Sequence, residues 1–491
     1  MAEFLAAAGQ KAWLVGGTVR DLMLGLDPHD IDLVTADDPE PLARSFADAV
    51  GGSFFVASEE FLTCRVVAAE KDLNYDFSAL RGRHIIEDLA ERDFTVNAMA
   101  VELPGVEKEA ARKKAVIAGK KPVPARKEPA PCAVIDPFGG AAHLAGRELV
   151  PVAGGIFDHD PIRMIRAARL EKARGLIIGP ELARLINSKA ALAARPAGER
   201  TFAELSRLLG APGAADSVQR LDKLGLLQVI LPEITALKGI VQNEYHHLDV
   251  YGHTLAFLEA LESVISGREN FFPGRGERIL ERINRRIAGD AGCRLVLILA
   301  GLFHDVAKPF CRFVDEDGLI RFFEHAKQGA EMVPGILARF RVSSAATVAV
   351  AHLVRRHMRF EGLIQEREPS ERARLRYLRA TEPFSQEAIV LSVSDRLSVR
   401  GILVTEADIA HHLELARDMM ERAFEKEDAV PLPKLIDGDV LMHELKLEPG
   451  PLVGSILDHI HEEQQLGNIS TPEQALAEAR KLASQEGGGV K

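Results

Sequence analysis

The sequence predicts an α+β protein, with a small mixed α/β amino-terminal domain followed by helical domains. Residues 1–104 alternate short β-like runs with helical stretches, which is typical of an α/β layout. From Pro161 onward this alternation disappears, and long stretches rich in Ala, Leu, Arg and Glu are punctuated by Gly and Pro. At 491 residues the chain is too long for one hydrophobic core, so we expect three or four domains.

The first domain is assigned to residues 1–150 and contains four β-like runs. These runs cover residues 12–15, 31–35, 63–68 and 73–77. Residues 105–131 form an Ala-, Pro- and Lys-rich segment with eight basic and three acidic residues, whose composition cannot build a core. We expect a loop or a disordered insertion there. Three helical domains are expected, at residues 151–240, 241–425 and 426–491.

The composition argues against several classes of protein. The net charge of −11 argues against a general nucleic-acid coat, although RNA binding needs only a local basic surface. The longest apolar run, at residues 295–303, is about half of the ~20 residues that span a bilayer. The amino terminus lacks the basic start of a secretory signal. Four cysteines without a C-x-x-C pair make disulfides and zinc unexpected, and a cytoplasmic protein with no membrane partner fits.

Residues 14–35 carry the most informative chemistry. An apolar run leads into Gly16 and Gly17, and paired glycines at a strand-to-helix junction expose backbone N–H groups to an anion such as a triphosphate. Asp30 and Asp32 are two apart, so on a strand both carboxylates project from the same face. Paired oxygen donors of this kind bind hard cations such as Mg²⁺. Together these parts predict a site for a nucleoside triphosphate and its metal ions.

Further motifs follow in order: GGTVRD and DID at residues 16–32, ERDFTVNA at 91–98, DPFGG at 136–140 and DPIRMIRAAR at 160–169. This series resembles the class II nucleotidyltransferases, which are the bacterial-type CCA-adding tRNA nucleotidyltransferases and their poly(A) polymerase relatives. The resemblance covers nearly the whole chain apart from the insertion. It implies a polymerase-beta-like head, a helical neck that reads the base, an HD-type domain and a helical tail.

The resemblance also implies a reaction and its metal-binding residues. The enzyme would transfer CMP, with or without AMP, from CTP and ATP to tRNA 3′ ends without a nucleic-acid template. Two Mg²⁺ ions would be held by Asp30 and Asp32, with Asp76 from a neighbouring strand as a third carboxylate. Gly16, Gly17 and Arg20 would hold the triphosphate.

The later motifs imply ribose and base recognition. Arg92 and Asp93, an arginine–carboxylate pair, would check the ribose together with Asn97. Asp160 and Arg163, three apart on one helix face, would imitate a base-pair edge, and Arg166 belongs to the same motif. The family usually has arginine where this chain has Glu91 and an acidic residue where it has His159, so fine base choice stays open.

A second group of residues, in the order H … HD … D, resembles the HD phosphohydrolase superfamily. It comprises His253, the pair His304 and Asp305, and Asp395; His325 and His357 match further ligands of two-metal members. Imidazole and carboxylate donors make a mixed site for a divalent transition metal or Mg²⁺. The resemblance leaves open whether the domain hydrolyses phosphoesters at RNA ends or serves only as scaffold. His352 is interpreted as structural.

The segment between the strand near Phe77 and the ERDFTVNA motif is short. In the resembling family a shortened loop accompanies enzymes that add two C residues and leave the final A to a partner enzyme. A longer flexible loop is one way to rearrange the base pocket so that it accepts A after C. A shortened loop therefore favours CC addition.

Three alternatives remain open at this point. They are a poly(A) polymerase, an RNA-end phosphohydrolase with a vestigial head, and a non-catalytic RNA-binding protein. The tail, residues 435–479, is expected to be helical and to bind the outer part of tRNA by its shape. Arginines at 355–359 and 372–379 are interpreted as solvated helix faces. The oligomeric state is left open.

Overall fold

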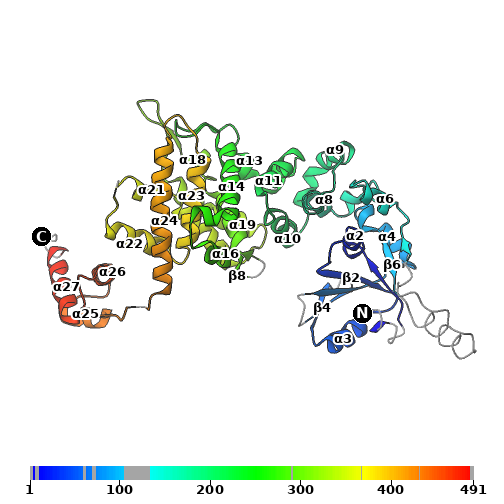
Figure 1. The fold of residues 1–491 in the computed structure, drawn as a ribbon, viewed down its shortest axis with the longest axis horizontal. Helices are drawn as coiled ribbons and strands as arrows, with labels where there is room; N and C mark the ends of the chain where they lie inside the picture. The colour runs from blue at the N-terminus through cyan, green and yellow to red at the C-terminus, as the bar shows by residue number, and fades with distance from the viewer. Residues whose placement is uncertain are drawn as a thin grey trace, which may run out of the picture. The chain divides into compact units, whose positions relative to one another are not determined.

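The computed structural model divides into two compact units (Figure 1). Unit 1 comprises residues 1–208 and 219–230, and unit 2 comprises residues 209–218 and 231–491. The predicted division into four domains stays a prediction, and the predicted insertion at 105–131 lies outside the described residues. The described ranges are 4–5, 10–58, 62–68, 73–103, 133–288, 291–366, 368–430 and 432–486.

A seven-stranded sheet organises the first part of unit 1, in the order β3-β4-β5-β2-β1-β6-β7. Its central strand β2 is antiparallel to β1 and parallel to β5. The four predicted strands are confirmed to within two residues, whereas β3, β6 and β7 were not predicted; β6 and β7 are only three and two residues long. The strands are β1 (Ala12–Val15), β2 (Asp30–Thr35), β3 (Ser53–Ser58), β4 (Thr63–Val67), β5 (Asn74–Ala79), β6 (Ala100–Glu102) and β7 (Val134–Ile135).

The two faces of this sheet have separate apolar cores. Leu33 of β2 packs in one cluster with Phe46 and Phe77, while its neighbour Val34 packs in another cluster with Leu89. This alternation follows from the two-residue period of a strand. It also places Asp32, two residues before Val34, on the Val34 side of β2 at the point where the strand leaves its core.

Short helices surround the sheet, and longer helices follow it in unit 1. They are α2 (Gly17–Met23), α3 (Pro39–Val50), α4 (Ile85–Ala90), α6 (Gly140–Ala145), α7 (Ile156–His159), α8 (Ile162–Arg174), α9 (Pro180–Lys189), α10 (Gly198–Leu209), α11 (Ala214–Lys223) and α12 (Leu227–Ile230), with 3₁₀ turns at Thr95–Asn97 and Ala190–Ala194. Helix α8 ends where Gly175 adopts a left-handed conformation with φ of 61°, a common helix terminator.

Unit 2 is mainly helical, which confirms the predicted α+β fold class. Helix α17 is apolar on all sides and every residue but one is buried, so it forms the centre of the core. Two short hairpins, β8–β9 and β10–β11, correct the expectation that no strands follow Pro161. Their strands are β8 (Arg286–Ala288), β9 (Ala291–Gly292), β10 (Arg312–Val314) and β11 (Ile320–Phe322).

The helices of unit 2 before the tail are α13 (Pro232–Thr235), α14 (Val250–Ser266), α15 (Arg268–Phe271), α16 (Gly276–Asn284), α17 (Cys293–Phe303), α18 (Lys308–Cys311), α19 (His325–Ala338), α20 (Ser344–Arg356), α21 (Arg359–Ile364), α22 (Glu371–Thr381), α23 (Ser385–Ser398) and α24 (Glu406–Asp428). Asp249 begins α14 by accepting a hydrogen bond from the backbone N–H of Gly252. Among the described helices, none is both long and apolar enough to cross a membrane.

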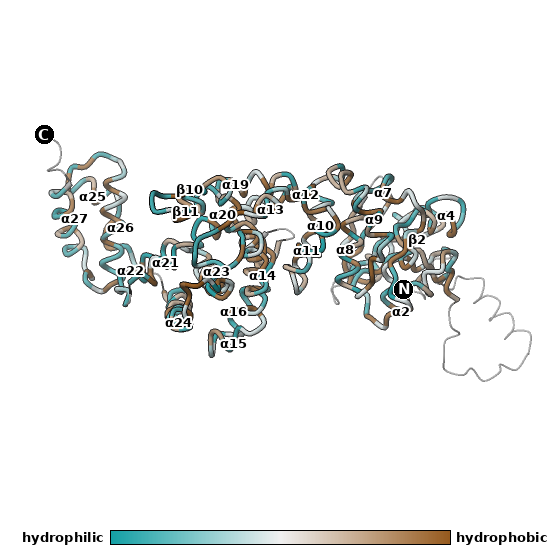
Figure 2. Tube along the Cα trace, turned by 90° about the horizontal axis from the view of Figure 1, so that it is seen from above, coloured by the Kyte–Doolittle hydropathy of each residue, from teal (hydrophilic) through white to brown (hydrophobic). Residues whose placement is uncertain are grey.

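The predicted helical tail is confirmed and has a small core of its own around Leu441, Ile456 and Ile460. Its helices are α25 (Gly438–Leu445), α26 (Pro451–Gln465) and α27 (Pro472–Glu486). Helices α22 and α26 lie side by side in both views (Figures 1 and 2).

Ion pairs join α22 to neighbouring helices. The pairs are Arg372 with Glu463, Arg376 with Glu462, Arg379 with Asp458, and Arg374 with Asp418 of α24. The interpretation of residues 372–379 as a purely solvated helix face is therefore wrong. Three of these arginines connect the tail to the helices before it.

Candidate functional site

Unit 1 contains a cavity of about 710 Å³ at the edge of the sheet. A cavity of this size is within the range that small-molecule ligands occupy. All but one of the head residues predicted from the sequence line it: Gly16, Gly17, Arg20, Asp30, Asp32, Asp76, Arg92, Asp93, Asn97, Arg163 and Arg166. The exception is Asp160.

Three carboxylates meet at one end of β2 and β5. Asp32 and Asp76 are direct partners in the parallel register, and Asn74 donates a hydrogen bond to Asp30 at 2.9 Å. Burial raises the pKa of Asp32 to about 6; Arg92 opposes this shift, and the neighbouring Asp76 and Asp30 add to it. A divalent cation would relieve this repulsion, and an all-oxygen donor set fits Mg²⁺.

Sequence reasoning missed Arg65, which lies on β4 opposite Asp76. Its Nε and Nη2 atoms donate to the two carboxylate oxygens of Asp76, both at 2.6 Å. This bidentate pair fixes the orientation of the carboxylate. Buried Cys64 and Val66 flank Arg65, so the alternation of β4 could have placed the arginine on the polar face, but only the register shows its partner.

The glycine turn lies directly against the ribose motif. Gly16 has φ of +64°, and a Cβ atom there would come within 2.7 Å of Arg92 Nη1, so only glycine fits. Helix α2 begins at the next residue, as predicted. Arg20 is buried, and its guanidinium donates to Asp21 and, at 2.6 Å, to Asn97. Arg20 therefore ties the glycine turn to the ribose motif.

The expected pair between Arg92 and Asp93 is not formed, which corrects the prediction. Arg92 donates instead to Asp88 at 2.9 and 3.1 Å. Asp93 accepts from the side chains of Asn97, at 2.9 Å, and Arg166, at 3.0 Å. Although burial acts to raise its pKa, the charge of Arg166 and these hydrogen bonds hold the pKa of Asp93 below its ordinary value. Asp93 is thus an ionised carboxylate in the cavity wall whose oxygens accept hydrogen bonds from Asn97, Arg166 and the backbone of Phe94.

The DPFGG turn supports the ribose motif from behind. Asp136 accepts hydrogen bonds from the backbone N–H groups of Gly140, at 2.7 Å, and Ala141, at 2.9 Å, and so begins α6. A Cβ atom on Gly140 would lie 2.1 Å from the carbonyl oxygen of Thr95. The second glycine therefore lets α6 contact the backbone of the ribose motif.

The expectation that Asp160 and Arg163 share a helix face is wrong. Helix α8 begins at Ile162, after Asp160, whose carboxylate pairs with Arg200 at 2.7 Å. Arg163 donates to the backbone carbonyl oxygens of Arg92, at 3.2 Å, and Glu91, at 2.7 Å. Arg163 thus joins the neck helix to the ribose motif.

A second residue that sequence reasoning missed is Glu204 of α10. It is buried and accepts from Arg166 Nε at 2.8 Å and Arg169 Nε at 2.5 Å. Both arginines line the cavity, so Glu204 orients two of the guanidinium groups in its wall. No motif marks this residue in the sequence, because its partners lie on a different helix.

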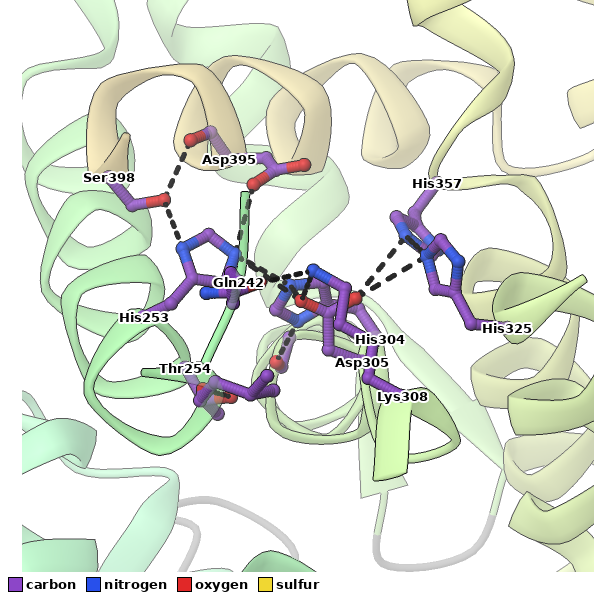
Figure 3. A network of polar contacts seen from close by, with 12 residues as sticks. Gln242, His253, Thr254, His304, Asp305, Lys308, His325, His357, Asp395 and Ser398 are labelled. Atoms are coloured by element: carbon purple, nitrogen blue, oxygen red, sulfur yellow. Dashed lines mark hydrogen bonds and ion pairs between the residues drawn. The ribbon is translucent and has the colours of Figure 1, made fainter. Parts of the chain in front are cut away.

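In unit 2, the structure gathers all six predicted histidine and aspartate residues (Figure 3). They form two adjoining trios whose ligand atoms lie within 4.8 Å of one another. One trio is His253, His304 and Asp395, and the other is Asp305, His325 and His357. The side chains come from α14, the end of α17, α19, the end of α20 and α23.

Each histidine presents Nε2 to the centre of the cluster. The Nδ1 atoms of His304, His325 and His357 each lie 2.7 Å from a backbone carbonyl oxygen, and Nδ1 of His253 lies 3.3 Å from Ser398 Oγ. These partners assign the proton to Nδ1 and leave the Nε2 lone pair free for a metal ion. Burial lowers the pKa of His357 to about 3, which also favours the neutral ring.

Asp305 lies between the two trios. Its Oδ2 atom is 3.1 Å from His304 Nε2, and its Oδ1 atom is 3.4 Å from His325 Nε2. Burial acts to raise its pKa, but His304 and Lys308 hold it well below the ordinary value. Lys308, 2.7 Å from Oδ2, was not singled out from the sequence, nor was Gln242, which accepts from it at 2.6 Å. The donor set fits two divalent cations bridged by one carboxylate.

Three family models match parts of this chain. Residues 12–149 match the poly A polymerase head domain, residues 175–238 the probable RNA and SrmB-binding site of polymerase A, and residues 275–400 the HD domain. The Thermotoga maritima CCA-adding enzyme complexed with tRNA shares the fold, with a TM-score of 0.54 at 21% identity, covering 99% of this chain and 93% of that one.

Two curated relatives match almost from end to end. The A-adding tRNA nucleotidyltransferase of Deinococcus radiodurans is 32% identical over 97% of this chain and 96% of its own length. The CC-adding tRNA nucleotidyltransferase of Thermus thermophilus is also 32% identical, over 95% of this chain and 93% of its own length. The chain is an enzyme and belongs to the CCA-adding tRNA nucleotidyltransferase family.

Proposed function

We propose that this enzyme adds CMP residues from CTP to tRNA 3′ ends and stops after CC. The observation that carries the proposal is the arginine-lined cavity with three carboxylates at one end, in a chain related over its length to A-adding and CC-adding enzymes. Asp30, Asp32 and Asp76 would hold Mg²⁺. Bound there, Mg²⁺ supplies charge neutralisation at the triphosphate and activation of the 3′-hydroxyl.

The remaining cavity residues position the nucleotide in this proposal. The turn at Gly16 and Gly17 offers backbone N–H groups to the triphosphate. Asn97 and Arg92 face the ribose, and Asp93 holds Asn97 in place. Arg163 presents its guanidinium to the incoming base or its phosphates. Asp160 reaches the base only if Arg200 releases its carboxylate.

The short loop supports CC addition. Only five residues, 80–84, separate β5 from α4. The backbone N–H of Arg81 donates to Asp88 at 3.2 Å, and that of Arg83 donates to Glu87 at 2.7 Å. Asp88 also holds Arg92, so this turn is anchored to the ribose motif. A loop this short, with its backbone held by hydrogen bonds, cannot rearrange the base pocket from C to A. A separate A-adding enzyme would therefore add the final A to the tRNA 3′ end.

An extension assay tests this proposal. The full-length protein with Mg²⁺ is given tRNA transcripts that end at the discriminator base, at C and at CC, with CTP and ATP supplied separately and together. Products that stop at CC are expected. Addition of A to the CC transcript alone would assign the chain to the A-adding type, completion to CCA would refute the loop argument, and a long A ladder would indicate a poly(A) polymerase.

A second activity is proposed for the histidine cluster because Asp305, which belongs to one trio, also lies 3.1 Å from His304 Nε2 of the other. We infer that it binds two divalent transition metal ions and hydrolyses phosphoesters at RNA ends, which would prepare the 3′-hydroxyl for addition. Release of phosphate from RNA carrying a 2′,3′-cyclic or 3′-phosphate, dependent on Mn²⁺ or Ni²⁺, is the expected result. A metal-loaded protein that leaves such ends intact would make the cluster structural.

A further inference from the structure

A groove of about 290 Å³ lies between α21 and α22 in unit 2. Three arginines line it: Arg359 from α21, and Arg372 and Arg376 from α22. Polar contributions come from Ser370 and Tyr377, and Glu366 supplies the only carboxylate among the described residues that line the groove. The lining is therefore strongly cationic, in a protein whose net charge is −11.

Two arginines at or close to this groove have no ion-pair partner among the described residues. Arg359 is exposed and forms no ion pair with any described residue. Arg356, three residues earlier, is likewise unpaired within the described ranges, and its Nε atom is buried without a hydrogen-bond partner. An anion would satisfy these groups.

The two arginines of α22 that line the groove are held in place by glutamates of the tail helix α26. Arg372 pairs with Glu463 and, at 3.4 Å, with Glu462 of α26. Arg376 uses its Nε atom for Glu462 at 3.2 Å, while its side chain remains 62% exposed. A guanidinium group carries five N–H donors, so donors remain on Arg376 after this bond. The glutamates thus anchor the arginines from one side and leave the groove side to an external acceptor.

We propose that this groove binds the phosphodiester backbone of the RNA substrate, an inference that rests on the proposed tRNA function. Arginines spread along two helices suit successive phosphates of a polyanion, and the groove adjoins the tail helix α26, which is predicted to bind tRNA. Because the protein as a whole is acidic, attraction to RNA requires a local cationic surface of this kind. Contacts to phosphates would set affinity and register without reading sequence.

Charge reversal at Arg359 is the sharpest test, because this side chain has no partner to lose in the folded protein. Two full-length variants are compared, Arg359→Glu and Arg376→Ala. The affinity of each for fluorescent tRNA is measured by fluorescence anisotropy at several KCl concentrations. Arg286→Glu is the matched control, since Arg286 is exposed, forms no ion pair with a described residue and lies on β8, outside the groove. We expect the dissociation constant for tRNA to rise about tenfold with Arg359→Glu, and the slope of log affinity against log salt to fall by about 1 for each lost phosphate contact.

Turnover at saturating tRNA and the KM for CTP are expected to stay unchanged, because the groove is not in the nucleotide cavity. Equal tRNA affinity for Arg359→Glu, Arg286→Glu and the wild type would overturn the inference. Competition by millimolar inorganic phosphate alone, with tRNA affinity unaffected by the variants, would also overturn it in favour of a small-anion site. If the wild type extends tRNA and the variants bind tRNA normally, only the inference about the groove is rejected. If the wild type neither binds nor extends tRNA, the proposed function is rejected as well.

Discussion

The nucleotide cavity of unit 1 and the histidine cluster of unit 2 are built by opposite strategies. In the cavity, the carboxylates lie on two adjacent strands and the walls are lined by arginines, leaving about 710 Å³ for a ligand. In the cluster, six donors from separate helices meet in a buried core, where His253, His304 and Asp305 are at most 2% exposed. An open charged cavity suits a substrate that must enter and leave. A buried set of imidazoles and carboxylates suits metal ions that remain bound.

The largest expected effect is a loss of activity at the nucleotide cavity that leaves the histidine cluster intact. Asp30→Ala combined with Asp32→Ala removes two of the three cavity carboxylates, so nucleotide transfer is expected to fall by about a thousandfold, since metal ions supply several kcal/mol of charge stabilisation. Metal binding and any phosphoester hydrolysis by the histidine cluster should persist. Extension and hydrolysis are measured on the same preparation. Loss of both activities would indicate misfolding or a shared site and would break the comparison.

The next largest effect concerns Asp305, which lies close to histidines of both trios. In the Asp30→Ala, Asp32→Ala background, only the cluster retains its ligands. Asp305→Asn is expected there to weaken Mn²⁺ binding by more than about a hundredfold, because loss of a metal ligand should exceed the 10–100-fold cost of losing an outer partner. Isothermal titration calorimetry measures this affinity. Asp315→Asn, in the β10–β11 hairpin, is the control. Unchanged Mn²⁺ affinity would show that the cluster does not bind metal through Asp305.

A pH-dependent prediction concerns Asp32. In metal-free protein, burial raises the pKa of Asp32 to about 6, above the ordinary value of an aspartate. The native state therefore holds this proton more tightly than the unfolded chain, and the contribution of Asp32 to stability falls as pH rises from about 4 through 6. Asp32→Asn should raise the free energy of unfolding more at pH 8 than at pH 5, by on the order of 1–2 kcal/mol.

Urea unfolding in the presence of EDTA measures this difference. Exposed Asp48, on α3, provides the control substitution Asp48→Asn, which should give the same change at both pH values. With Mg²⁺ present, the requirement for the ion should increase below pH 6, because protonated Asp32 cannot bind it. A pH-independent effect of Asp32→Asn would show that the pKa of Asp32 is not raised in the native state.

The smallest expected effect tests the outer partners of the cluster. Ser398→Ala removes the hydroxyl next to His253 Nδ1, at 3.3 Å, and should weaken metal affinity by about tenfold because the imidazole loses its fixed orientation. Ser394→Ala is the matched control: this residue lies on the same helix, is also buried, and donates to the carbonyl oxygen of Val390. Equal affinities for both variants would show that Ser398 does not orient the ring.

Local patterns in the sequence predicted much of both sites. The apolar run that ends at Leu33 and Val34 predicted β2, and the two-residue spacing of Asp30 and Asp32 predicted their common face. The four predicted strands were found to within two residues. The short β6 and β7 were missed because two or three residues give no period. The pair between Arg92 and Asp93 was predicted wrongly, because adjacent residues tend to point in different directions and each found its partner on another element.

By itself the sequence determined the fold class, the order of the motifs and the identity of the groups that can bind metal ions, since these follow from periodicity and side-chain chemistry. Only the tertiary structure decided which groups are paired. Arg65 with Asp76, Glu204 with Arg166, and α22 with α26 join segments that are distant in the chain. A partner of this kind is set by strand register and helix packing, and neither leaves a local signal in the sequence.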